Sequence, residues 1–314
     1  MTVVDTRIPR QNYVRTLRIV NGFAAILHFA LFLWIVIDDA DWKVPVVVSY
    51  VNWGKTNVTE GCEVKGNCYV SLKSHTYSTQ LSLAATVAIF HLLSCVWEAI
   101  PIVAFAQYYA QCVFLGTNPF RWGEYFISAA SMIIPIAVIL GQIDIFAIVA
   151  VMGLTSATML FGFQQELVLA YDVILQLCAE RGVLVMAREK QEFAQRLLSA
   201  FKFLSHFGGW FCFVISWGLL TFAFFVSLNF SEVSPPSSIY PIIVSVQVTM
   251  LLLFGCFGFV QVYQVSSGER SIKRSVAIEI AYISLSFASK ALLGVLVYMG
   301  IRARDRELDL GTNL

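Results

Sequence analysis

Seven apolar stretches, each long enough to cross a lipid bilayer as a helix, fill most of this chain of 314 residues. A helix needs about 20 apolar residues to span the hydrocarbon core. Charged residues make up only 13% of the chain, too few for a soluble globular protein. The pattern predicts an all-α integral membrane protein, a bundle of seven transmembrane helices. The stretches are Ile19 to Ile37, Gln80 to Ala106, Tyr125 to Gln142, Ile145 to Leu169, Phe203 to Leu228, Ile239 to Val265 and Val276 to Ile301.

The whole chain, residues 1–314, is expected to form one membrane domain with two additions. In the loop 38–78, β-branched and aromatic residues at 44–51 and several turn-forming glycines favour a short β-hairpin. In the segment 171–202, apolar residues alternate with charges. This second pattern fits either an amphipathic helix on the membrane surface or an extension of the fourth and fifth spans. No internal repeat is visible in the chain, which disfavours an inverted-repeat transporter.

Positive charges indicate how the chain is oriented in the membrane. Arginine and lysine cluster before the first span, after the fourth span and between the sixth and seventh spans, all on one side. Positive charges collect on the cytoplasmic side, so we expect a multi-pass protein with its N-terminus in the cytoplasm and its C-terminus outside. The outer side then holds glycosylation patterns at Asn57 and Asn229, and also Cys62 and Cys68, which an oxidising environment would allow to pair.

One lysine, Lys290, lies near the middle of the uncharged apolar run Ile280 to Ile301. An ammonium group at that depth costs roughly 2.5 to 3.5 kcal/mol on insertion scales. Some other group must therefore neutralise, pair with or react with this side chain. A buried lysine is also the side chain that forms Schiff bases with carbonyl compounds. A charged Schiff base in a membrane would need a carboxylate facing it.

Four glutamates lie inside or at the ends of the predicted spans: Glu98, Glu124, Glu166 and Glu279. Glu166 and Glu279 lie toward inner ends, where contact with water or headgroups would explain them. Glu98 lies closer to the inner end of the second span. Glu124 therefore remains the best partner for Lys290 among the four.

Two helical faces carry polar residues at offsets of three and four, which brings side chains into register. The first face holds Arg121, Glu124, Tyr125 and Ser128, and the second holds Tyr282, Ser286 and Lys290. A hydroxyl one turn before the lysine is able to accept a hydrogen bond from a protonated Schiff base. Two simpler interpretations stay open on spacing alone, namely a local Arg121 to Glu124 ion pair and a serine bonded to its own backbone.

The runs RWGEYFISAASM at 121–132 and EIAYISLSFASK at 279–290 resemble the third and seventh helices of heliorhodopsins. Heliorhodopsins are seven-helix retinal proteins with the N-terminus inside. The resemblance extends to four more segments, at 21–28, 90–91, 153–166 and 260–261. It implies a light-absorbing photoreceptor, which is not an enzyme.

Transferred residue by residue, the resemblance implies that Lys290 binds all-trans retinal covalently and that Glu124 is its counterion. Ser128 and Ser286 match positions beside the Schiff base, and Tyr125 follows the counterion. His28 and His91 match two histidines of an inner-side polar cluster that the family uses in proton movement. Glu98, an inner glutamate of this chain, is a further candidate for proton transfer. Three apolar side chains are expected along the polyene, although such residues are core by default: Phe257, Trp217 and Met159.

The expected function is light sensing through a slow photocycle, with a signalling partner at the inner surface, for which the segment 171–202 is a candidate. The alternative is a light-activated proton channel or transporter. Ser128 and Met132 follow Glu124 where related pumps carry a second carboxylate, so an efficient outward pump is not expected. In a third class, a transporter or membrane enzyme without retinal, Lys290 would be structural. Membrane lipid and, by the resemblance, a second copy in a homodimer are the other expected partners, and nucleic acid is not.

Overall fold

The computed structural model describes residues 11–38, 40–53, 70–180, 182, 188–230, 237–266 and 271–312. Several sequence features lie outside these residues: the glycosylation pattern that begins at Asn57, the last residue of the one at Asn229, and both Cys62 and Cys68.

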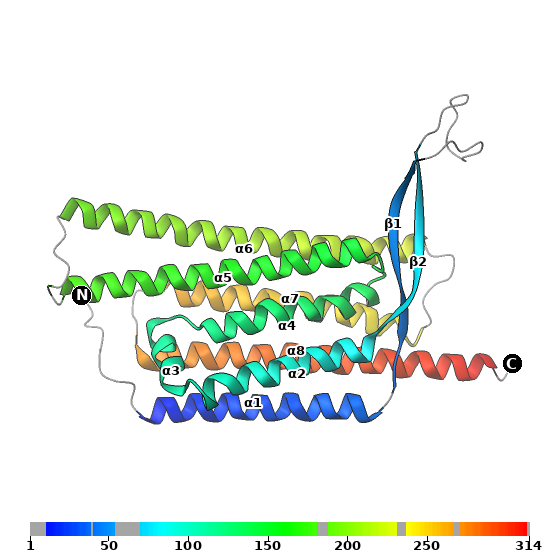
Figure 1. Ribbon diagram of the computed structural model, residues 1–314, viewed down its shortest axis with the longest axis horizontal. Helices are drawn as coiled ribbons and strands as arrows, with labels where there is room; N and C mark the ends of the chain where they lie inside the picture. The colour runs from blue at the N-terminus through cyan, green and yellow to red at the C-terminus, as the bar shows by residue number, and fades with distance from the viewer. Residues whose placement is uncertain are drawn as a thin grey trace.

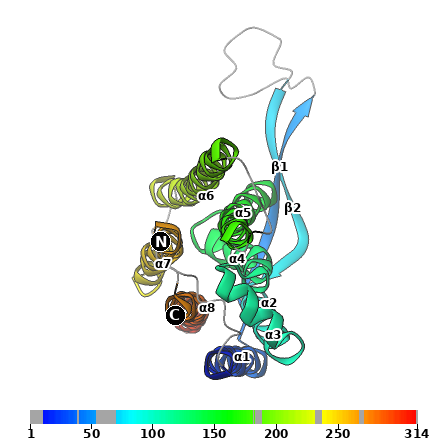
Figure 2. The ribbon, with the colours of Figure 1, turned by 90° about the vertical axis from the view of Figure 1, so that its left-hand side faces the viewer.

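Among the described residues, seven helices are long and apolar enough to cross a membrane, so the predicted seven-helix bundle is confirmed. They run side by side along the long axis of the molecule (Figures 1 and 2). Their bounds are α1 Gln11–Asp38, α2 Leu83–Val103, α4 Pro119–Ile139, α5 Ile145–Glu180, α6 Arg188–Phe230, α7 Tyr240–Ser266 and α8 Ile272–Thr312. A short helix that the sequence did not predict, α3 (Ala106–Leu115), lies between α2 and α4.

The expected β-hairpin is present and is longer than the sequence indicated. Its strands β1 (Lys43–Trp53) and β2 (Val70–Ser82) pair antiparallel and project from one end of the bundle (Figure 1). The backbone N–H of Ser49 donates to Asp144 at 2.7 Å, which ties β1 to the turn between α4 and α5. We call this end of the bundle the hairpin end, and the end that carries α3 the α3 end.

The start of α4 is set by local sequence signals. Asn118 caps the helix by accepting from the N–H groups of Phe120 and Arg121, and Pro119 takes the first helical position, where its missing N–H costs nothing. Gly116 ends α3 with a φ of 81°, a conformation that other residues rarely adopt. Since α4 begins six residues before the expected Tyr125, Arg121 and Glu124 both lie within its first turns.

The segment 171–202 belongs to α5 and α6 wherever the structure describes it. The helix α5 continues to Glu180 and α6 begins at Arg188, and both reach beyond the other helices at the α3 end (Figure 1). The described part of the segment is therefore an extension of two spans, and it does not form a separate helix on the membrane surface.

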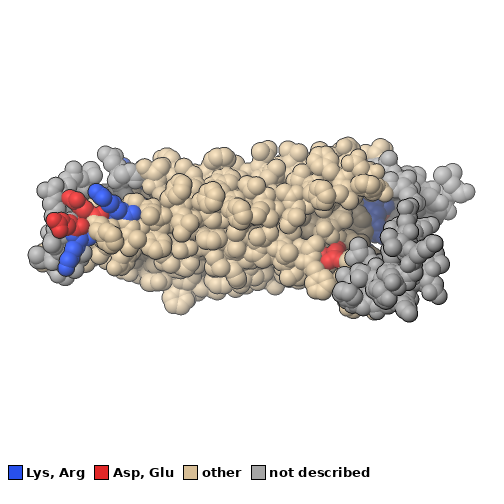
Figure 3. Space-filling model, turned by 90° about the horizontal axis from the view of Figure 1, so that it is seen from above, with Lys and Arg blue, Asp and Glu red and all other residues tan. Residues whose placement is uncertain are grey.

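The surface of the bundle is apolar along its middle. Figure 3 shows one face with lysine, arginine, aspartate and glutamate only near the two ends, among the described residues. Many large apolar side chains point outward, for example Phe222, which is 69% exposed. An apolar belt of this kind is stable only against lipid. The chain is therefore an integral, multi-pass membrane protein.

Candidate functional site

Lys290 and Glu124 are in direct contact in the interior of the bundle. The Nζ atom of Lys290 donates to Oε1 of Glu124, and also to Oγ of Ser286 at 2.9 Å. The residues are only 2%, 5% and 2% exposed, respectively. A buried lysine is tolerated only when its charge is paired and its N–H groups are hydrogen-bonded. The structure thus brings together three residues that the sequence analysis singled out, from α4 and α8.

Tyr125 and Ser128 complete the α4 side of this site. The ring centroid of Tyr125 lies 5.4 Å from Nζ of Lys290, and its hydroxyl donates to the backbone oxygen of Tyr282 at 3.1 Å. Ser128 is fully buried, and its hydroxyl has no hydrogen-bond partner among the described residues. An unpaired buried hydroxyl usually marks a place for water or a bound group.

A pair of buried histidines lies beside the lysine. The Nδ1 atoms of His28 and His91 are 2.9 Å apart, and Nε2 of His28 lies 3.8 Å from Glu98. His28 packs on Phe287, while Gly294 lies against His91. Phe287 and Gly294 lie about one turn on either side of Lys290 along α8, so both histidines lie beside the lysine. One of the two Nδ1 atoms must donate to the other, so the rings differ in protonation or tautomer.

An apolar cavity opens between α4, α5, α6 and α7. Met159 and Phe257 line this cavity, as do Phe213 and Phe254. Trp217 is buried behind them, with its ring centroid 5.6 Å from that of Phe254. Phe257 packs edge-on against Tyr125, with centroids 5.3 Å apart, so the cavity lies next to the lysine site. Its lining is mostly apolar, as expected of a site for an apolar ligand.

A second buried ionic group, which the sequence analysis did not find, lies toward the α3 end. The Arg121 guanidinium forms ion pairs with both Glu166 and Glu279 and is 5% exposed. Glu166 and Glu279 are 0% and 3% exposed, so the expectation that water or headgroups surround them is wrong. The alternative pairing of Arg121 with Glu124 is also wrong, because each of these side chains has another partner. The reason is tertiary, since α5 and α8 bring the two carboxylates to α4.

Neighbouring polar side chains fix this ionic group in place. Asn118 donates from Nδ2 to Glu279 at 2.7 Å and from its backbone N–H to Glu166 at 3.0 Å. The Tyr109 hydroxyl of α3 donates to Glu279 at 3.1 Å, and Trp122 donates to Glu166 at 2.7 Å. The carboxylates thereby accept several hydrogen bonds each, which compensates for their burial. The capping pattern around Asn118 was the one readable signal of this cluster.

A protein-family model described as Heliorhodopsin matches residues 17–301, which is most of the chain. The matched range contains every site residue described above, from His28 to Lys290. No curated protein matches the chain.

Proposed function

The chain belongs to the heliorhodopsin family, whose members are retinal-binding, light-sensing rhodopsins, and on that premise we propose that Lys290 binds all-trans retinal covalently as a protonated Schiff base, with Glu124 as counterion. The contact between Lys290 and Glu124 in the buried interior carries this proposal. It supplies both a reactive amine and the negative charge that a protonated Schiff base requires.

The residues around Lys290 fit such a ligand. The apolar cavity beside Tyr125 offers Met159 and Phe257 to a long, uncharged chain, while Trp217 supports the far wall. When bound, retinal supplies visible absorption and a light-driven isomerisation. A mostly apolar cleft with a few polar groups at one end is the usual design of a cofactor site.

The polar side chains of the site control a proton on the Lys290 nitrogen. Glu124 stabilises the positive charge, and Ser286 accepts a hydrogen bond from the same nitrogen. Of the described carboxylates, Glu124 alone lies within 4.0 Å of Lys290, so it is the first acceptor for a proton that leaves. Ser128 follows one turn later with its unpaired hydroxyl. A serine at this place cannot act as a second acceptor at neutral pH.

We favour a slow photocycle for signalling, with the N-terminus in the cytoplasm. The extended ends of α5 and α6 then lie on the cytoplasmic side, where they support contact with a signalling partner. A homodimer is part of the proposal, because the related proteins that this chain resembles are homodimers. Size determination in detergent, together with labelling of the α5–α6 ends from each side of the membrane, tests both points.

A light-activated proton channel or transporter is the second candidate. It is favoured by the chain of buried polar groups from Glu98 through His28 to His91. A protonated Schiff base with a single counterion does not need these three groups. Buried titratable groups in a membrane are costly and commonly serve proton movement.

The two candidates are separated by one set of recordings. Cells that express the chain are supplied with all-trans retinal, and light-triggered current is measured under voltage clamp at several pH values. The Glu124→Gln variant is the matched control. A proton current that disappears in this variant supports conduction, whereas a visible pigment without current supports the sensor. No visible absorbance after retinal addition would contradict both.

A further inference from the structure

Glu124 lies against a polar cavity that extends toward the α3 end. This counterion cavity has about 20 Å³ of water-accessible space and is lined by Glu98 and Glu124, by Asn21, and by Arg121 and Glu279. It thus connects the lysine site with the buried ionic group, which lies one turn nearer the α3 end along α4.

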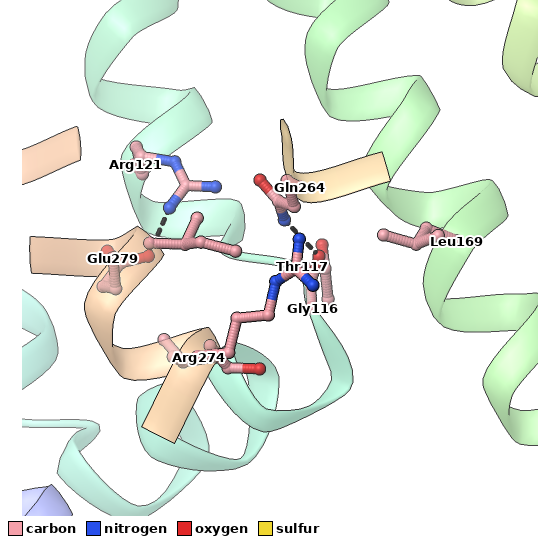
Figure 4. A pocket seen from close by; sticks show the side chains of 10 residues that line it. Gly116, Thr117, Arg121, Leu169, Gln264, Arg274 and Glu279 are labelled. Atoms are coloured by element: carbon pink, nitrogen blue, oxygen red, sulfur yellow. Dashed lines mark hydrogen bonds and ion pairs between the residues drawn. The ribbon is translucent and has the colours of Figure 1, made fainter. Parts of the chain in front are cut away.

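A second hollow reaches the same ionic group from the α3 end. This end vestibule has about 30 Å³ of water-accessible space and lies where α3 meets the starts of α4 and α8 (Figure 4). Thr117, Gln264 and Arg274 line it, together with Arg121 and Glu279. Figure 4 shows the ion pair of Arg121 and Glu279 at one side of the hollow.

The Arg121–Glu279 ion pair therefore belongs to the walls of both cavities. We propose that this ion pair is the gate of a one-sided water route between Glu124 and the α3 end, with Glu279 as the carboxylate that exchanges protons across the gate. The inference rests on the proposed function, in which Glu124 receives a proton from the Lys290 nitrogen. A proton passes from water in the counterion cavity to Glu279 and then to water in the vestibule. Glu279 regains its charge, so no co-reactant is needed.

Unpaired polar atoms on both sides of the gate indicate where water lies. In the counterion cavity, Oε2 of Glu98 is buried without a hydrogen-bond partner among the described residues. The same is true of Oγ1 of Thr117 in the vestibule and of Nε of Arg121, a residue that lines both cavities. Glu98, Thr117 and Arg121 are all less than 9% exposed. Buried polar atoms of this kind are normally hydrated, and each cavity has room for water.

The opposite side of the lysine site is packed with aliphatic side chains. Ile133 and Ile136 of α4 and Leu293, Val297 and Ile301 of α8 are each 0% or 1% exposed. They belong to the main apolar core between Lys290 and the hairpin end. An aliphatic layer of this kind opposes proton entry, because aliphatic side chains do not replace the hydration of the proton. The route accordingly opens toward one end of the bundle.

Glu279 differs from Glu166 in its position relative to the two cavities. Both carboxylates pair with Arg121, but Glu279 lines both cavities, while Glu166 lines neither of them. Glu166 is instead held by Trp122 and by the backbone of Asn118. The two carboxylates thus form a matched pair for mutation, with equal charge and the same arginine partner.

Several titratable groups of the described residues interact with Glu279, and Arg274 lines the vestibule together with it. These groups come from α3, α4, α5 and its own helix α8: Tyr109, Arg121, Tyr125, Glu166 and Tyr282. Arg121 also lies over the ring of Tyr282, with its Cζ atom 3.9 Å from the centroid. Gate opening requires Arg121 to leave Glu279 while the second carboxylate, Glu166, still holds it.

The first test needs no retinal. Single cysteines are introduced by Thr117→Cys in the vestibule and Asn21→Cys in the counterion cavity, and a small membrane-impermeant thiol reagent is added from the α3 side. Labelling above the background of the native cysteines is expected for Thr117→Cys, and protection is expected for Asn21→Cys. Adding Glu279→Gln to Asn21→Cys should produce labelling, whereas adding Glu166→Gln should not. Equal labelling in both double variants, or labelling from the hairpin side, would overturn the gate.

The second test follows the bound pigment in vesicles of known orientation. After a flash, return of the proton to the Lys290 nitrogen should slow about tenfold for each unit of pH increase on the α3 side, as expected for uptake from that solution. The rate of this return should not depend on the pH on the hairpin side. Glu279→Gln should remove this dependence, and Glu166→Gln should keep it. If Glu279→Gln does not fold, Thr117→Leu, which touches no ion pair, should slow the return by filling the vestibule.

The outcomes separate the two levels of the proposal. A wild-type protein that forms no visible pigment contradicts retinal binding, and the gate falls with it. A pigment whose proton return follows the pH on the hairpin side contradicts the gate alone. The same holds if Thr117→Leu leaves the rate unchanged, or if Glu279→Gln and Glu166→Gln alter it equally.

Discussion

Replacement of Glu124 by glutamine should shift the proton equilibrium of the Lys290 nitrogen strongly toward its neutral form. Glutamine keeps the size of the side chain and removes the charge. Lys290 and Glu124 are only 2% and 5% exposed, so solvent screens their interaction little. Removal of one partner from a buried ion pair costs about 3 to 5 kcal/mol, because the other charge stays uncompensated. At 1.36 kcal/mol per factor of ten, this is a shift of about 10² to 10⁴ in the equilibrium.

The assay is a pH titration of the visible band after retinal addition, since the protonated and neutral forms absorb at different wavelengths. The Glu124→Gln pigment should lose its visible band at a pH about two to four units lower than the wild type does. Glu98→Gln is the control, because Glu98 lines the same cavity without contacting Lys290. Its effect should be about tenfold or less, as expected for a more distant charge. Equal shifts in the two variants would refute the assignment of Glu124.

Three further predictions follow from single contacts. Ser286→Ala removes one hydrogen bond to the charged Lys290 nitrogen. In the same titration, the free energy of protonation of that nitrogen should become less favourable by about 1.5 to 3 kcal/mol, a smaller change than for loss of the counterion. Gly162→Ala places a methyl group 2.2 Å from the ring of Trp122 and should lower the free energy of unfolding by about 1 to 3 kcal/mol. Gly153→Ala is the control, because the space around Gly153 is open, and it should not lower the free energy of unfolding. Hydrogen bonds lower the pKa of the Asp144 carboxyl, and the largest contribution comes from the side chain of Ser49 in β1. The contact between Asp144 and β1 should therefore be complete above the ordinary aspartate pKa of about 3.9 and be lost as the pH falls through the lowered pKa. Protease cleavage of β1, measured against pH, checks this expectation. Asp144→Asn should loosen the hairpin at neutral pH.

The membrane fold could be predicted from the sequence because its main signal is local. A bilayer demands about 20 apolar residues per helix, and this requirement is visible in any single segment. The β-hairpin was also local, since β-branched residues and turn glycines mark it. The start of α4 was missed by six residues because the prediction followed the apolar run from Tyr125, whereas the helix begins earlier, at the Asn118 cap. Gln80 was assigned to the second span, although it pairs with Pro45 in the hairpin.

The site was only partly accessible to sequence reasoning. Lys290 is conspicuous because a single charge in an apolar run has no local explanation. The choice of Glu124 over a local partner depended on the resemblance, because spacing along α4 also allows a contact with Arg121. The pairing of Arg121 with Glu166 and Glu279 joins three helices across the bundle, and no periodicity within one helix encodes it. The cavities on either side of that cluster are likewise visible only in three dimensions.

The central claim, a covalent link between retinal and Lys290, is tested most directly by reduction of the pigment with borohydride, followed by digestion and peptide mass analysis. The account predicts that the retinyl group is found on the peptide that contains Lys290, and that Lys290→Ala yields neither the modified peptide nor a visible band. A retinyl group on another lysine, or a visible band that survives Lys290→Ala, would contradict it.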